Sequence, residues 1–235
     1  MAALAGFALL SSGVALIIWF YLRALRRAEF IRAYAFPKGL YDKFAARRPE
    51  LERKDFALVA RGLRQFFLAY LKCGRRFVSM PSQAADDLWH EFILYTKNYE
   101  QFCAKAFGGF LHHSPAAVLT PAQQQGNEGL RRVWWHACKE ENINPARPTR
   151  LPLLFALDAK LKIAGGFVYM ANCEALRASG SGATTYCGGD FSSSSIDGST
   201  SGFGAGEGGG AGDSGAGDSG GGGGCGGGGC GGGGD

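Results

Sequence analysis

The sequence predicts an all-α protein with an N-terminal transmembrane helix, a compact helical bundle and a disordered glycine-rich C-terminal tail. Three observations support this prediction. Residues 2–22 carry no charged side chain. Apolar residues recur at helical spacing within residues 37–178. After Arg177 the chain contains no Lys or Arg and is rich in glycine. We therefore expect an anchor with its juxtamembrane helix over 1–36, a globular domain over 37–178 and a tail over 179–235.

The uncharged N-terminal segment is long enough to cross a membrane, because about 20 apolar helical residues span the roughly 30 Å hydrocarbon core. A secretory signal peptide is the alternative interpretation. It needs a basic region before the apolar run and small residues at a cleavage site. Here no basic residue precedes the run, and bulky Trp19, Phe20 and Tyr21 lie at its end. We therefore expect an uncleaved, single-pass membrane anchor.

Arginines follow the apolar segment at once, at positions 23, 26, 27 and 32. The positive-inside rule places the side with these arginines in the cytoplasm. The sequence therefore predicts a membrane protein with its N-terminus outside and its C-terminal domain in the cytoplasm.

The charge of the chain is unevenly distributed. The sequence has 25 Lys and Arg against 20 Asp and Glu, a net charge of +5. Because every residue after Arg177 is neutral or acidic, residues 1–177 carry a larger net positive charge than the whole chain. A basic body is compatible with nucleic acid or an anionic lipid surface. The bases are scattered in short pairs and accompany no nucleic-acid-binding motif, so we expect no specific nucleic-acid partner.

Seven cysteines occur at irregular spacing. In a cytoplasmic domain such cysteines are mostly reduced thiols rather than a disulfide framework. Cys225 and Cys230 separate runs of four glycines in the tail. A flexible spacer is the simplest interpretation of this tract, and a tip whose thiols bind metal or pair with each other is the alternative.

Helix boundaries are marked by proline, glycine and capping residues. The anchor helix should continue to about Phe36, where Pro37 and Gly39 end it. A second helix should begin near Pro49 and end at Gly74. Three further helices are expected: from the N-cap Ser82 to Ala106, from a capping box at 120–123 through Ala137, and over 153–163. Residues 167–176 are compatible with either a strand or a helical end.

Polar and aromatic residues are concentrated in residues 81–115. On a helix, Asp86 lies one turn before His90, close enough to bond its imidazole ring. A carboxylate that orients a histidine suits a metal ligand or a general base, and it equally suits a buried structural histidine. Trp89 and Tyr99 lie on the opposite, apolar face of the same predicted helix.

Further metal-ligand side chains follow in the same segment. His112 and His113 can approach His90 across the turn at 108–109, and Cys103 adds a sulfur ligand. Such nitrogen and sulfur ligands suit zinc, or else iron. The spacing matches no standard metal motif, however, and we expect no obligatory cofactor. The candidate binding residues of the segment are Asp86, Trp89, His90, Tyr99, Cys103, His112 and His113.

Signatures of catalysis are missing from the sequence. It contains no G-x-S-x-G elbow, no P-loop and no dinucleotide-binding fingerprint between a strand and a helix. A role in binding is therefore favoured over a role as an enzyme.

The run Asp86-Asp87-Leu88-Trp89-His90, followed by Tyr99, Cys103 and Leu111-His112-His113, resembles a pattern of glycine-rich domain-containing proteins, a family of plants and bacteria. The resemblance extends over residues 78–115 and more loosely over 40–175. Plant members often have a second histidine two residues after the first, where this chain has Phe92. The resemblance implies no established reaction.

These observations lead to one main functional hypothesis and two alternatives. The main hypothesis is a binding or scaffolding module that holds a protein partner at the membrane. The first alternative is a metal sensor or metal-dependent enzyme that uses His90, Cys103 and His113, with Asp86 as the orienting group. The second is a basic domain that binds lipid or nucleic acid.

Overall fold

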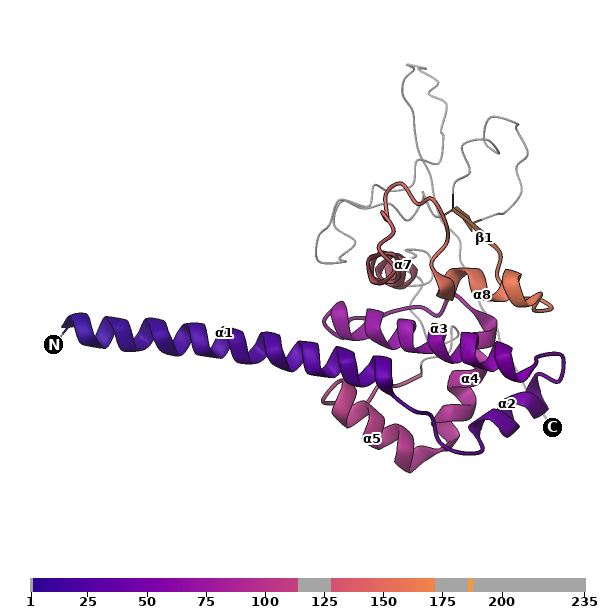
Figure 1. Cartoon of the computed structure of the whole chain (residues 1–235), viewed down its shortest axis with the longest axis horizontal. Helices are drawn as coiled ribbons and strands as arrows, with labels where there is room; N and C mark the ends of the chain where they lie inside the picture. The colour runs from indigo at the N-terminus through magenta and orange to yellow at the C-terminus, as the bar shows by residue number, and fades with distance from the viewer. Residues whose placement is uncertain (1, 114–127, 172–185, 188–235) are drawn as a thin grey trace, which may run out of the picture. The chain divides into compact units, whose positions relative to one another are not determined.

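The computed structural model describes residues 2–113, 128–171 and 186–187, which form a body of packed helices (Figure 1). A short parallel pair of strands follows, in which Tyr169 lies opposite Tyr186. The elements of the described residues are α1 (Ala2–Ala33), α2 (Leu40–Arg47), α3 (Arg53–Lys72), α4 (Gln83–Leu94), α5 (Thr96–Ala106), α7 (Glu128–Glu140), α8 (Leu153–Leu161), β1 (Tyr169–Met170) and β2 (Tyr186–Cys187).

Helix α3 is the centre of the body and packs against α1, α4, α7 and α8. Its start is stabilised by Asp55, whose carboxylate accepts a hydrogen bond from the Glu52 N–H at 2.9 Å. At its end Gly74 and Arg75 both have positive φ, and their N–H groups bond the carbonyls of Leu71 and Tyr70. This is the Schellman pattern, in which glycine adopts the left-handed conformation at little cost. The predicted end at Gly74 is confirmed.

Aromatic rings fill the core between α3, α4 and α5. The ring of Phe67 lies 4.9 Å from that of Phe102 and 6.0 Å from those of Trp89 and Phe107. Such tilted and edge-to-face pairs add stabilisation beyond the burial of apolar area. Ala28 and Ile31 of α1 belong to the same core, so the last turns of α1 are part of the packed body.

The prediction of a transmembrane helix, and with it the single-pass localisation with a cytoplasmic C-terminal domain, is wrong. Among the residues that the structure describes, no helix combines the length and the apolarity needed to cross a membrane. Figure 1 shows α1 leaving the body, with its C-terminal end beside α3 and α5.

The single helix predicted from Ser82 to Ala106 is two helices, α4 and α5, separated at Tyr95. Tyr95 has ψ 58° and ends α4 with a tight turn from its N–H to the Phe92 carbonyl. The bend brings the rings of Tyr99 and Phe102 within 5.3 and 5.6 Å of the Phe92 ring. Packing across the bend thus compensates for the interrupted helix, and neither glycine nor proline marks the position.

The remaining helices agree in part with the prediction. Helix α8 lies within the predicted segment 153–163 and ends at Leu161, followed by the C-cap Lys162 with φ 54°. Helix α2 was not anticipated. The predicted capping box at 120–123 and the tail from residue 179, apart from 186–187, lie outside the described residues. Ser82 is the N-cap of α4 as expected, because its Oγ accepts a hydrogen bond from the Ala85 N–H at 3.2 Å.

One buried carboxylate joins α8 to the start of α4. Asp158 is 2% exposed. Its Oδ1 accepts from Ser82 Oγ at 2.7 Å and from the Ala84 N–H at 3.2 Å. Its Oδ2 accepts from the N–H groups of Gln83 at 2.7 Å and Phe167 at 2.9 Å. The negative charge also complements the helix dipole at the N-terminus of α4.

We expect Asp158→Asn to destabilise the fold by about 2–4 kcal/mol, because an amide must point its NH2 group at two donors that the lost oxygen satisfied. Urea unfolding followed by circular dichroism measures the change. The matched control is Asp42→Asn at an exposed position of α2, with an expected change below about 0.5 kcal/mol. Equal stability of the two variants would contradict the central role of Asp158.

Candidate metal centre

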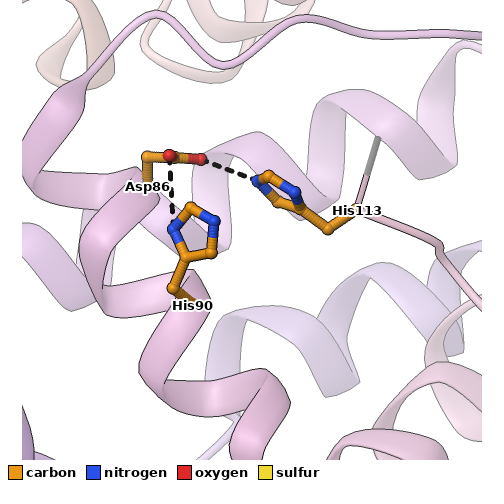
Figure 2. A group of neighbouring side chains, drawn as sticks. All are labelled: Asp86, His90 and His113. Carbon is orange, nitrogen blue, oxygen red and sulfur yellow. Dashed lines mark hydrogen bonds and ion pairs between the residues drawn. The ribbon is translucent and has the colours of Figure 1, made fainter. Parts of the chain in front are cut away.

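Three side chains meet at one wall of the helical body: Asp86 and His90 from α4, and His113 from the loop that follows α5. Asp86 Oδ1 lies 3.1 Å from His113 Nε2, and Asp86 Oδ2 lies 3.3 Å from His90 Nδ1. The two imidazole rings are 4.3 Å apart between centroids. Figure 2 shows both rings directed at the carboxylate, so α4 and a loop distant in sequence build one polar cluster.

The two histidines relate to the carboxylate differently. An ionised carboxylate only accepts, so His113 Nε2–H donates the hydrogen bond to Asp86 Oδ1. His90 Nδ1 is within ion-pair distance of Asp86 Oδ2 but is not aligned for a hydrogen bond, and it is shielded from solvent. A buried polar atom without a hydrogen bond is costly unless something else satisfies it.

The cluster has the composition of a metal site. One ligand atom from each residue lies within 4.8 Å of the other two. Imidazole nitrogens and a carboxylate oxygen bind zinc at about 2.0–2.2 Å, which places ligand atoms roughly 3–4 Å apart. Small rotations of the side chains therefore close the set around an ion. His90 Nδ1, which has no hydrogen bond within the described part of the chain, is an atom that such an ion would satisfy.

A pocket of about 670 Å³ adjoins the cluster. All three residues of the cluster line it, together with aromatic side chains from α3, α4 and three loops. Arg75 brings a positive charge to the same lining. A concave, mostly apolar pocket with a few polar groups at one side is the usual form of a small-molecule site. Its aromatic lining residues are Phe66, Tyr70, Phe77, Trp89, Phe110 and Phe167.

A buried hydrogen-bond relay connects the two halves of the cluster. Trp89 Nε1–H donates to Tyr99 Oη at 3.1 Å, and Tyr99 O–H donates to the Leu111 carbonyl at 2.5 Å. Trp89 precedes His90 on α4, and Leu111 lies two residues before His113. The Trp89 indole also packs edge-on against the His113 imidazole, at 4.6 Å between centroids. Trp89 and Tyr99 are thus positioning residues for both histidines.

The other two predicted ligands lie outside the cluster. Cys103 is 1% exposed in the aromatic core, and burial raises the pKa of its thiol. His112 is exposed and contacts Phe110 with its ring tilted, at 4.8 Å between ring centroids. Of the residues named from sequence, the structure therefore brings Asp86, His90 and His113 together.

Sequence reasoning missed most of the pocket and its supports. Phe77 and Phe167 belong to connecting segments, where periodicity carries no signal. Asp158 holds the Phe167 backbone and the start of α4, yet it occupies an apolar helix as an isolated acidic residue. That isolation is the one local signal that could have identified Asp158, because a lone carboxylate on a buried helix usually has partners.

Removing the hydroxyl of the relay should loosen the loop that carries His113. We expect Tyr99→Phe to lower the free energy of unfolding by about 1–3 kcal/mol, because the Trp89 N–H and the Leu111 carbonyl both lose their partner. Amide hydrogen exchange of residues 110–113 should accelerate in the same variant. Tyr41→Phe is the control. The Tyr41 ring makes a cation–π contact with Arg53, which the substitution keeps, and its hydroxyl is not part of the relay. Unchanged exchange in Tyr99→Phe would show that the relay does not hold the loop.

Three thiols should resist alkylation in the folded protein. Burial raises the pKa of Cys73 and Cys103, and raises that of Cys138 to about 12. A raised thiol pKa lowers the fraction of reactive thiolate, so these cysteines should stay unlabelled by iodoacetamide at pH 8 until denaturant is added. Peptide mapping by mass spectrometry measures the labelling of each site. Rapid labelling of Cys103 without denaturant would contradict its burial.

Comparison with known proteins gives the family. A family model described as UCP032817-like matches residues 26–191, whereas no curated protein and no solved structure matches the chain significantly. The resemblance to glycine-rich domain-containing proteins is therefore wrong. Several residues behind it, including Leu88, Trp89, Tyr99 and Cys103, are buried in the core, where helix packing alone favours such residue types. Because the match covers more than half of the sequence, the chain belongs to the UCP032817-like family.

Proposed function

We propose that the helical body is a metal-dependent binding module, in which Asp86, His90 and His113 hold a divalent ion at the wall of a small-molecule pocket. The observation that carries this proposal is the convergence of one ligand atom from each residue within 4.8 Å, beside a pocket of about 670 Å³. The proposal takes up the metal-binding alternative from the sequence, with Asp86 in place of Cys103 as the third ligand. The ligand of the module is a small molecule held by a metal ion.

The ligand set favours zinc or ferrous iron among the common divalent ions. Two imidazoles and one carboxylate are the protein ligands of many zinc sites with an open coordination position. The same set, arranged on one face of the ion, also suits non-haem ferrous iron. Calcium and magnesium prefer sites built from oxygen alone. An ion with three protein ligands keeps positions at which an oxygen or nitrogen of a ligand can bind.

The surroundings of the cluster supply orientation and selectivity. Asp86 is fixed on α4, whose first turn is held by Asp158 and Ser82. His113 is fixed by its contact with the Trp89 ring. The aromatic walls of the pocket favour a ligand with a planar or apolar body. A ligand that offers one metal-binding group and such a body fits both parts of the pocket.

Metal binding should also release protons, since the ligands must be deprotonated. His113 Nε2 carries a proton in its hydrogen bond to Asp86, and that proton has to leave or move to Nδ1 when the nitrogen ligates an ion. Because protons compete with the metal ion for the same ligand atoms, affinity should fall as the pH is lowered.

The direct test is metal stoichiometry of the full-length protein. We expect about one zinc ion per chain after equilibration with zinc and removal of excess, measured by elemental mass spectrometry. His90→Ala and His113→Ala should each lose the ion, because two remaining ligands bind weakly. His112→Ala is the matched control, since this histidine follows in the same loop but lies outside the cluster.

Cobalt substitution distinguishes metal bound at Asp86, His90 and His113 from metal bound by the cysteines of the tail. Thiolate ligands give cobalt strong charge-transfer absorption in the near ultraviolet, whereas a site of nitrogen and oxygen ligands gives weak visible bands. We expect weak visible bands that disappear in His90→Ala. Metal content equal in the wild type, His90→Ala and His112→Ala, or a thiolate spectrum alone, would contradict the proposal.

A further inference from the structure

A second group of side chains gathers where α1 meets α5, and one of its members, Arg75, also lines the pocket beside the candidate metal centre. Arg23 and Arg27 of α1 and Arg75 from the end of α3 line a cleft of about 420 Å³ beside Gly108. A neighbouring cleft of about 570 Å³ shares Arg23 and Arg27 and adds Arg26 and Lys105. Neither lining contains Asp or Glu. Five positive side chains thus surround two adjoining clefts without a carboxylate to neutralise them.

The arginines are held close together although they repel one another. Burial and the charges of Arg23 and Arg75 lower the pKa of Arg27. Within the described residues, no ion pair joins Arg23, Arg27 or Arg75 to an acidic side chain. By contrast, Arg32 on the same helix pairs with Glu140 at 2.6 Å. Uncompensated like charges at one place favour the binding of an anion.

Gly108 lets the arginines approach. It has φ 73°, a conformation that glycine adopts readily, and a Cβ at this position would collide with Arg27 Nη2. Arg75 Nη1 donates to the Phe107 carbonyl at 3.3 Å, at the C-terminal end of α5. Through this contact the positive charge of Arg75 interacts with the negative, C-terminal end of the α5 dipole. The Arg23 guanidinium lies over the Trp19 ring at 5.1 Å from its centroid, and within the described residues Arg27 has no such role.

We propose that Arg23, Arg27 and Arg75 bind a phosphate group in the cleft beside Gly108. Three guanidinium groups offer many N–H donors. A carboxylate has only two oxygens and one negative charge, so it cannot accept hydrogen bonds from all of them. A phosphate group offers three or more acceptor oxygens and up to two charges, and guanidinium binds it in a bidentate manner. Phe20, Leu71 and Phe107 line the same cleft and can pack against an apolar part of the molecule that carries the phosphate.

The test uses the full-length protein, freed of metal by chelation and dialysis, with inorganic pyrophosphate as the first probe in isothermal titration calorimetry. Arg27→Gln and Arg75→Gln should each weaken binding about three- to tenfold, the usual range for a charge-assisted contact at an accessible site. Raising the salt concentration should weaken wild-type binding as well. Arg61→Gln, an exposed arginine of α3 outside both clefts, is the matched control and should leave the affinity unchanged.

A second probe distinguishes a soluble phosphate from a lipid headgroup. Phosphatidylcholine vesicles with and without phosphatidic acid are tested by co-sedimentation. Binding of pyrophosphate alone assigns a soluble ligand, and binding to phosphatidic acid that Arg27→Gln weakens assigns a headgroup. His90→Ala should bind both probes like the wild type, which separates this site from the metal centre. The proposal is overturned if neither probe binds, or if Arg27→Gln, Arg75→Gln and Arg61→Gln all bind equally.

Discussion

The arrangement of the site depends on one buried carboxylate. Asp158 of α8 accepts hydrogen bonds from Ser82, Gln83 and Ala84, which together begin α4. The N–H groups at the start of a helix have no partner within the helix, so a carboxylate from another element can determine where that helix starts and how it is oriented. Asp86 and His90 lie within the following two turns of α4. A change at Asp158 should therefore affect the candidate metal centre although Asp158 does not contact it.

Buried hydrogen bonds also explain why the candidate centre combines residues from distant parts of the chain. The bend at Tyr95 turns α5 back along α4, and the Tyr99 hydroxyl then joins the Trp89 indole to the Leu111 carbonyl. Each buried polar atom of this relay has a partner inside an aromatic core, where an unpaired one would be costly. His113 follows Leu111 closely and is thereby brought to Asp86. Hydrogen bonds buried within the core thus position the half-buried polar cluster at its surface.

Local sequence signals predicted the elements better than the connections between them. Ser82 as an N-cap and Gly74 as a helix end follow from backbone chemistry at single positions, and both are confirmed. The bend at Tyr95 depends on packing of Phe92 against residues after it, and no local signal marks it. The membrane helix was inferred from the length and apolarity of residues 2–22 and is contradicted by the structure, since no helix of the described residues is long and apolar enough to cross a membrane. For the candidate site, the spacing of Asp86 and His90 predicted their contact, whereas the approach of His113 rather than His112 or Cys103 required tertiary structure.

The most direct test of the account is a crystal structure of the zinc-loaded protein, with anomalous diffraction data collected on both sides of the zinc absorption edge. We expect one anomalous peak within about 2.0–2.2 Å of an Asp86 oxygen and of one nitrogen each from His90 and His113. The pocket should open toward the remaining coordination positions of the ion. A peak bound to cysteine sulfur instead, or no peak at this cluster under saturating zinc, would contradict the assignment of the metal centre.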